Sequence, residues 1–382
     1  MKQLHLAIIR QRFTPFGGAE RIIARTLETL QARGVRVTMI TRKWEGADSF
    51  EHVVCAPFHI GRLWRDRSFE RCACNVVARG GFDLVQSHTR VACCDLHRAG
   101  DGLHRVWLQE RRRAVGWPQR LALTVSPYHR YLLDAERRVF TNPRIRAIVC
   151  NSEMVRNEIA THFDVPAEKL HVIYSGVDTN AFHPRLRDEH RAATRQRYAV
   201  PADAPLFLFV GSGFLRKGVG QALSALARQP DGVHLMVVGY DRKTRWFERQ
   251  ARVLGIDQWV RFVGPQRDVG PFYGAADALV LPTLYDPFPN AALEAMAAGL
   301  PVITSTKSGA AELIEEGRNG FVRDALDVDG LAQAMGQLSD GERAASMGEA
   351  ARITVEPLTM ERMSDCLLAL YEELLRTKLE AR

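Results

Sequence analysis

Two carboxylates, Asp286 and Glu294, stand eight positions apart in the stretch DPFPNAALEAMAAGLPV. The strand-like run ALVLPT precedes the first acid, and a helix pattern rich in small residues carries the second. An acid just past a strand and another on the next helix can reach hydroxyl groups at two ends of one ligand. Because an ionised carboxylate accepts several hydrogen bonds, the pair suits a polyhydroxylated ligand such as a sugar. The alternative is that both are helix-start acids that bind no substrate.

A glycine-rich turn with two cations, GSGFLRKG, follows the strand-like run LFLFV. Backbone amides beside Arg216 and Lys217 suit a diphosphate, whose negative charge grows when a leaving group departs. The turn lacks the Gly-Lys-Ser/Thr order of a Walker A loop and the third glycine of a dinucleotide fingerprint. The alternative, a solvated cation pair at a helix start, would place positive charge at the unfavourable end of the helix dipole.

The stretch PFGG near the N-terminus is a second glycine loop. Its glycines let the backbone approach a ligand and deliver it to a helix N-terminus, where free N–H groups favour phosphate. This signal is weak alone, because half of such loops are only tight turns.

Alternating strand and helix patterns must position these residues. LHLAII, the PFGG loop, AERIIARTLETLQARG and VRVTMIT form a strand–helix–strand opening, and a second series begins at LFLFVGSG. Such alternation predicts mainly parallel sheets covered by helices, with ligands outside the carboxyl ends of the strands. Residues 185–205 between the two series are interpreted as a linker with a small helix, and the C-terminus as an amphipathic helix.

Length, composition and cysteine content limit the class of protein. A chain of 382 residues suits two domains, and we place them at 1–180 and 190–357, with the helix at 358–382 packing back on the first. Apolar residues at 46% and charged residues at 25% exclude a disordered or fibrous chain. Seven cysteines without a C-x-x-C pair predict reduced thiols rather than a disulfide framework or a zinc site. Neither a cleavable leader nor a spanning segment is evident, which favours a cytosolic protein.

The net charge of +8 is concentrated in residues 105–146, where ten arginines face three acids among Trp, Tyr and Leu residues. Guanidinium groups pair with phosphate while aromatic rings occupy an interface, so the segment suits an anionic membrane surface or an anionic glycan. A solvated surface and a nucleic-acid groove are the alternatives.

The motifs together resemble one enzyme family. DPFPNAALEAMAAGLPVITSTKSGAAELI is similar to the acid-x7-acid signature of retaining nucleotide-sugar glycosyltransferases of family 4, and FGGAER, SGVDTNAFHP and FVGSGFLRKGV fall in the order of that family. The resemblance covers most of the chain and implies an α/β GT-B fold, two doubly wound Rossmann-like domains facing across a cleft. Two departures are Asp286, where Glu is usual, and Ser175, where Asn is common.

The resemblance implies a role for each site residue. Arg216 and Lys217 hold the diphosphate, Asp286 binds hydroxyls of the donor sugar and is counted with them as catalytic, and Glu294 binds the ribose. Asp101 is the further catalytic candidate and His88 the acceptor-binding one, although a lone His near a strand end is more often structural. The remaining donor-binding positions are the closing glycines and the backbone before the second acid: Gly17, Gly18, Phe288, Pro289, Asn290 and Ala291.

The stretches TPFGG, GSGFLRKGV and YHRYLLDAERRVF are similar to family members that glucosylate the inner-core heptose of bacterial lipopolysaccharide. That similarity implies transfer of glucose from UDP-glucose to a lipid-linked glycan acceptor. It also implies a cytoplasmic enzyme held peripherally on the anionic inner-membrane surface by residues 105–146. No nucleic-acid partner is expected. The D-x-D triplet at 327–329 lies away from the glycine loops, so we expect no metal and no cofactor. The alternatives are the same fold with another polysaccharide or small acceptor, a nucleotide-sugar epimerase, and an RNA-binding protein.

Overall fold

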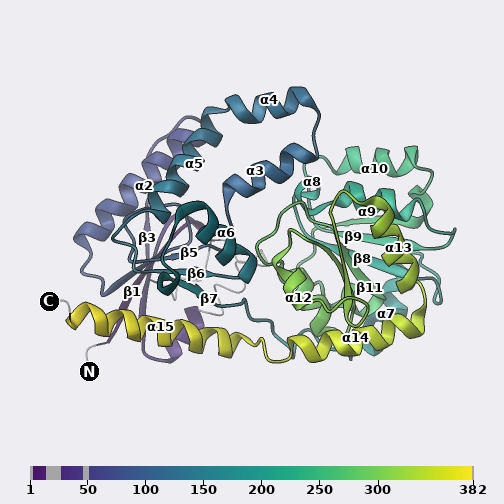
Figure 1. The fold of residues 1–382 in the computed structure, drawn as a ribbon. Helices are drawn as coiled ribbons and strands as arrows, with labels where there is room; N and C mark the ends of the chain where they lie inside the picture. Colours follow the sequence, from purple (N-terminus) through teal and green to yellow (C-terminus); the bar gives the residue numbers. More distant parts are fainter. Residues whose placement is uncertain (1–2, 14–26, 46–50, 381–382) are drawn as a thin grey trace. The chain divides into compact units, whose positions relative to one another are not determined.

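The computed structural model describes residues 3–13, 27–45 and 51–380. The chain divides into two compact units, the first comprising Met1–Gly176 with Met360–Arg382 and the second Val177–Thr359. The predicted site residues Gly17 and Gly18 lie outside the described residues. Each unit is built around its own parallel sheet (Figure 1).

The described part of the first unit contains a seven-stranded parallel sheet in the order β3-β2-β1-β4-β5-β6-β7. Parallel strands require crossover connections, and helices lie in those from β3 to β4, from β5 to β6 and from β6 to β7, whereas residues 88–95 join β4 to β5 without a helix. The strands are β1 (His5–Phe13), β2 (Arg36–Trp44), β3 (Glu51–Val54), β4 (Leu84–Ser87), β5 (Leu96–Arg98), β6 (Ala147–Cys150) and β7 (Leu170–Val172). The described helices are α2 (Gly61–Arg79), α3 (His104–Arg113), α4 (Trp117–Val125), α5 (Pro127–Phe140), α6 (Glu153–Phe163), η1 (Ala167–Lys169) and α15 (Met360–Glu380).

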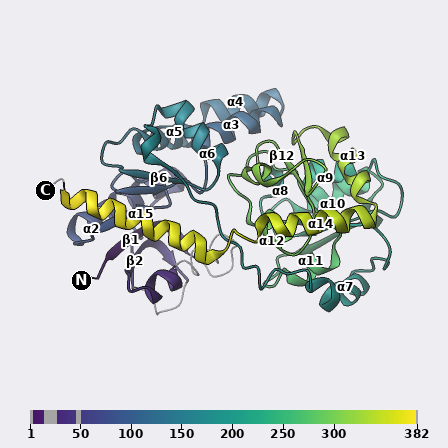
Figure 2. The same cartoon turned by 60° about the horizontal axis from the view of Figure 1, so that its bottom comes forward.

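The C-terminal helix α15 lies against the first sheet (Figure 2). Met363, Leu367 and Leu370 from α15 share one buried core with Leu6 and Ile8 of β1. An amphipathic helix must bury its apolar stripe against another element. The last residues of the sequence therefore complete the unit that the first residues begin.

The second unit contains, in its described residues, a six-stranded parallel sheet in the order β10-β9-β8-β11-β12-β13. The strands are β8 (Leu206–Val210), β9 (His234–Val238), β10 (Val260–Gly264), β11 (Ala278–Leu281), β12 (Val302–Ser305) and β13 (Gly320–Arg323). The helices are α7 (Leu186–Arg197), α8 (Phe214–Lys217), α9 (Val219–Leu226), α10 (Thr244–Val253), η2 (Asp257–Trp259), α11 (Gly270–Ala275), α12 (Asn290–Ala297), η3 (Gly309–Leu313), α13 (Val328–Leu338) and α14 (Gly341–Val355). Strands such as LFLFV are apolar throughout because helices cover both faces of the sheet.

The charged segment 185–205 is an integral part of the second unit rather than a linker. Its helix α7 packs on α11, and the guanidinium of Arg195 is almost fully buried. Arg195 forms an ion pair with Asp277 at 2.7 Å and donates to the carbonyl of Ala275 at 2.9 Å. A buried charge is tolerated when its hydrogen bonds are satisfied in this way.

The expectation that all cysteines are reduced thiols is wrong for four of them. The structure joins Cys55 to Cys72 and Cys74 to Cys93, with Cα–Cα distances of 5.7 and 5.6 Å that suit disulfides. The bonds tie α2 to the residue after β3 and to the loop after β4. Their spacing along the chain carries no recognisable signal, because three separate elements bring the sulfurs together.

Candidate active site

Asp286 lies in the loop after β11, at the carboxyl edge of the second sheet, and is 6% exposed. Its backbone is fixed from both sides, since its N–H donates to the carbonyl of Lys307 and its carbonyl accepts from Gly309, both at 2.9 Å. The carboxylate forms ion pairs with Lys217 and, at 3.2 Å, with Arg216. Three residues that sequence reasoning assigned to one ligand therefore form one cluster.

The short helix α8 delivers the two cations to Asp286. Gly218 follows α8 with φ +84°, and a Cβ there would lie 2.0 Å from the carbonyl oxygen of Pro282. Only glycine permits so close an approach at positive φ. The carbonyl of Arg216 also accepts from Leu284 N–H at 2.8 Å and from the Thr283 hydroxyl at 3.0 Å. The loop after β8 is thereby locked to the loop after β11.

The opposite charges in this cluster favour one another's ionised forms. Burial raises the pKa of Asp286, but Lys217 and Arg216 outweigh it and hold the pKa below its usual value. Burial lowers the pKa of Lys217, and Asp286 and Glu294 oppose that effect. The influence of Glu294 on Lys217 shows that both acids belong to the same electrostatic environment.

Glu294 lies within α12, one turn past its start, and its side chain is buried. The Tyr273 hydroxyl on α11 donates to Glu294 Oε2 at 2.8 Å, and its oxygen lies 3.3 Å from the carbonyl oxygen of Ala291. A buried carboxylate held by a phenol keeps one orientation. Tyr273 is thus a positioning residue that the sequence pattern did not single out.

The segment from Phe288 to Ala291 joins the two acids. Pro289 occupies the N-cap position of α12 without a side-chain hydrogen bond, and the helix begins at Asn290. The first amides of a helix lack partners within it, so the amides of Asn290 and Ala291 are suited to a ligand oxygen. Asp286 and Ser308 form an isolated backbone bridge, and the buried Ser308 hydroxyl has no hydrogen-bond partner among the described residues.

The remaining two predicted residues lie in the first unit. His88 follows β4 and Asp101 follows β5, so both stand at the carboxyl edge of that sheet. Asp101 is exposed, whereas His88 is half-buried and contacts Gln86 at 2.6 Å. Burial, together with Arg98 and Arg10, lowers the pKa of His88 well below its ordinary value, so the ring is neutral.

The D-x-D triplet at 327–329 makes structural contacts in the second unit. Asp327 caps α13 by accepting from the amide of Gly330 at 2.9 Å, and Asp329 pairs with Arg228. Over the described ranges of the chain, no group of three or more His, Cys, Asp or Glu residues could hold a metal ion.

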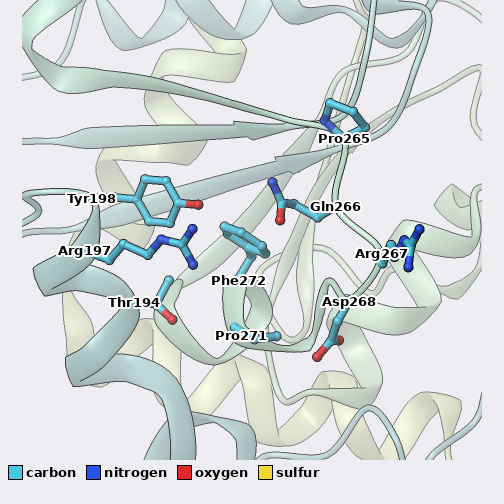
Figure 3. Close-up of a pocket in the computed structure, with 9 residues that line it drawn as sticks. All are labelled: Thr194, Arg197, Tyr198, Pro265, Gln266, Arg267, Asp268, Pro271 and Phe272. Atoms are coloured by element: carbon cyan, nitrogen blue, oxygen red, sulfur yellow. The ribbon is translucent and has the colours of Figure 1, made fainter.

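A hollow of about 440 Å³ lies elsewhere in the second unit, between α7 and the loop from β10 to α11. Figure 3 shows Phe272 between Tyr198 and Arg197 on one side and the loop from Pro265 to Asp268 on the other. It contains none of the predicted site residues. The hollow and the Asp286 cluster are therefore separate features of the second unit.

Comparison with known proteins places this geometry in a family. Residues 16–181 match the family described as Glycosyltransferase Family 4, and residues 204–340 match the one described as Glycosyl transferases group 1. The lipopolysaccharide core biosynthesis glycosyltransferase LpsE of Rhizobium meliloti is 33% identical over 363 residues, which cover 93% of this chain and 95% of the relative. The chain belongs to glycosyltransferase family 4.

Other relatives of this glycosyltransferase agree. The lipopolysaccharide glucosyltransferase WaaG of Escherichia coli K12 is 28% identical over 83% of this chain and 84% of its own. The crystal structure of WaaG, with 24% identity, superposes with a TM-score of 0.83 over 96% of this chain and 99% of its own, which shows the GT-B fold. Anabaena HepE, whose structure was solved with UDP-glucose, has a TM-score of 0.72 at 20% identity over the full length of both chains.

Proposed function

We propose that this glycosyltransferase is a retaining hexosyltransferase that moves glucose from UDP-glucose to a lipid-linked glycan. The proposed acceptor is the inner-core heptose of lipopolysaccharide. The cluster of Asp286, Arg216, Lys217 and Glu294 carries the proposal, because it gathers two cations and two acids at the carboxyl edge of one parallel sheet. The relatives LpsE and WaaG act on lipopolysaccharide by name.

The donor fits the cluster by its chemistry. Arg216 and Lys217 balance the diphosphate, Asp286 accepts hydrogen bonds from sugar hydroxyls, and Glu294 accepts from the ribose. The amides at the start of α12 supply further donors for the phosphate or the sugar. In the free protein Asp286 pairs with both cations but balances only one of their two charges, and the incoming diphosphate supplies the further negative charge.

The reaction follows from these contacts. The acceptor hydroxyl oxygen attacks the anomeric carbon on the face from which the diphosphate departs. The bond between that carbon and the phosphate oxygen breaks, and this oxygen takes the proton of the attacking hydroxyl. Arg216 and Lys217 stabilise the growing negative charge. Neither a metal nor another cofactor is needed, so a chelator should leave turnover unchanged.

The first unit offers a membrane-contacting surface within residues 105–146. On α4, Trp117, Leu121 and Val125 are spaced four residues apart on one face and are 75%, 58% and 53% exposed. Arginines line the preceding helix α3 at its last turn. An exposed apolar stripe beside arginines fits the boundary of an anionic bilayer better than a nucleic-acid groove. In the described residues, no helix has the length and apolar character to cross a bilayer. We therefore propose peripheral binding on the cytoplasmic side of the inner membrane.

One experiment tests the proposed reaction directly. The purified protein is offered a panel of nucleotide sugars, each with and without a heptose-containing lipopolysaccharide core lacking glucose, and the anomeric configuration of any product is determined. We expect UDP-glucose to be used, with retention and only in the presence of acceptor. Epimerisation of the donor without acceptor, or an inverted product, would refute the proposal.

A further inference from the structure

A buried guanidinium without an acidic partner stands at the carboxyl edge of the first sheet. Arg98 is the last residue of β5 and is 8% exposed. In the described part of the chain its side chain donates a hydrogen bond to Met363 Sδ on α15 at 3.6 Å, and a thioether is a weak acceptor. Within the ranges that the structure describes, no carboxylate pairs with Arg98, and the charged or polar groups that influence it are Tyr371 and Arg10.

Arg195 in the second unit is a buried guanidinium with a structural role, and it offers a comparison for Arg98. Arg195 has an aspartate and four backbone carbonyls as partners. Leaving a buried charge uncompensated costs several kcal/mol. Among the described residues no acid or carbonyl gives Arg98 that compensation, so we infer that its charge is available for a ligand.

The described side chains that interact electrostatically with Arg98 are positive or neutral. Arg10 on β1 and His88 after β4 both interact electrostatically with it. β1, β4 and β5 are consecutive neighbours in the sheet, so their carboxyl ends meet at one edge. Ligands of parallel sheets bind at that edge.

A hydrogen-bond relay from the C-terminal helix orients His88. The Tyr371 hydroxyl donates to Gln86 Oε1 at 2.7 Å, which leaves the Gln86 amide to donate to His88 Nε2 at 2.6 Å. Nε2 is therefore an acceptor, and the proton of the neutral ring sits on Nδ1. In the described part of the chain no residue accepts that Nδ1 proton, so it is a second donor beside the guanidinium.

We propose that Arg98 and His88 form a subsite for an oxyanion, a phosphate or carboxylate carried by the acceptor glycan. A guanidinium fork matches the paired oxygens of these groups, and a neutral imidazole N–H adds a hydrogen bond without adding charge. Asp101 follows Arg98 by three residues, so a bound oxyanion would hold the acceptor beside the exposed carboxylate at that edge. The inference rests on the proposed function, since it assigns the anion to the acceptor of the transfer.

Direct binding tests the subsite without relying on turnover. The probes are inorganic phosphate, a hexose 6-phosphate and a hexuronic acid, with the neutral hexose as reference. Calorimetry and thermal unfolding compare the wild type with Arg98→Met and with Arg79→Met, a matched charge loss on an exposed residue at the end of α2. We expect the anionic probes to bind the wild type and Arg79→Met, and the affinity to fall roughly 10- to 100-fold in Arg98→Met. The sugar phosphate and the hexuronic acid report which oxyanion is preferred.

Stability gives a second readout. Because Arg98 pairs with no carboxylate of the described residues, Arg98→Met should melt no lower than the wild type without ligand, and it should lose the rise in melting temperature that the anion causes. Should Arg98→Met fail to fold, Tyr371→Phe removes a single hydroxyl from the relay and should weaken phosphate binding several-fold through His88.

The outcomes separate this inference from the proposed function. Anion binding that is unaffected by Arg98→Met and Tyr371→Phe, or absent from the wild type, overturns the subsite even if UDP-glucose is still transferred. Anion binding that depends on Arg98 in a protein without transferase activity upholds the subsite and refutes the acceptor assignment. Binding of UDP-glucose should be equal in all variants.

Discussion

Lys217 is the residue whose loss should affect turnover most. Its side chain is 11% exposed, and its ammonium group pairs with Asp286 and would face the departing diphosphate. We expect Lys217→Ala to lower kcat by roughly 10²- to 10³-fold with saturating donor, as for other groups that stabilise a developing anion. Lys243→Ala, the same change at an exposed position of the second unit, is the control. Near-normal turnover of Lys217→Ala would remove Lys217 from the mechanism.

Tyr273 should act through Glu294 rather than on the reacting atoms. Removing its hydroxyl leaves the carboxylate that we assign to the ribose without the bond at 2.8 Å. We expect Tyr273→Phe to raise KM for the donor about tenfold, the value of one hydrogen bond to a charged group, with kcat nearly unchanged. Tyr198→Phe, at the hollow of Figure 3, is the matched control. A fall in kcat with unchanged KM would contradict the positioning role.

At the residue scale the sequence predicted the groups that carry chemistry better than those that hold them. Arg216 and Lys217 stand in a glycine turn after one strand and Asp286 in the loop after another, and the structure brings the three together. Tyr273 and Ser308 carry no such pattern. Their roles depend on which side of α11 and which turn after β12 face the cluster, and only tertiary packing decides that.

At the element scale, the two disulfides that attach α2 to its neighbours should stabilise the folded protein. Cys55–Cys72 and Cys74–Cys93 close loops with sequence separations of 17 and 19 residues. Each crosslink of this size is worth about 3 kcal/mol against the unfolded chain. We expect a reductant to lower the melting temperature of the oxidised protein.

The number of disulfides can be measured by alkylating the free thiols. Alkylation of the denatured protein without reductant should label only Cys94, Cys150 and Cys366, the free thiols of the structure. With reductant all seven cysteines should react. Seven labelled cysteines before reduction would show that the bonds are absent, in agreement with a reducing cytosol.

Helix α4 should carry much of the proposed membrane affinity. Replacing Trp117 and Leu121 by Ser removes the exposed apolar stripe while retaining the arginines. We expect binding to anionic vesicles to weaken at least tenfold, because two large side chains no longer enter the interface. Sedimentation with vesicles at low and high salt measures this, and Trp246→Ser in the second unit is the control for an exposed Trp.

Neutralising Arg111, Arg112 and Arg113 together should reduce the salt-sensitive part of the same binding. Arg111 contacts the Trp107 ring at 5.9 Å and Arg113 pairs with Glu110, so folding of each variant is checked by its melting temperature. Vesicle binding that is unchanged in both sets would remove this surface from the proposal.

The elements themselves were predictable where apolar runs are long. The runs LHLAII, VRVTMIT, LFLFV and ALVLPT coincide with β1, β2, β8 and β11. The short strands β3, β5 and β7 were not anticipated, since three or four residues are too few to show a period. Helix α7 was interpreted as part of a linker because its arginines look solvated, whereas Arg195 is buried by partners distant in sequence.

At the scale of the whole molecule, buried neutral histidines make the first unit sensitive to acid. Burial, with a smaller contribution from Arg90, lowers the pKa of both His97 and His104 to about 3. His97 contacts the ring of Phe140, and its Nδ1 has no hydrogen-bond partner within the described ranges of the chain. His104 Nε2 lies 3.0 Å from His129 Nδ1. In each case the folded state resists a proton that the unfolded chain accepts near pH 6.5.

The sign of the effect follows from this difference. Above pH 6.5 the histidines are neutral in the folded and the unfolded state and do not change the free energy of unfolding. As pH falls below 6.5, only the unfolded state binds the protons. The free energy of unfolding therefore decreases until about pH 3. For His97 the loss by pH 5 is about 2 kcal/mol, from 1.36 kcal/mol per pKa unit. We expect chemical unfolding monitored between pH 7.5 and 5 to show falling stability in the wild type and a smaller fall in His97→Gln. His171→Gln, at a half-buried position of β7, is the matched control. Stability that is flat over this range, or a slope that His97→Gln leaves unchanged, would mean that the buried histidines take up protons without unfolding.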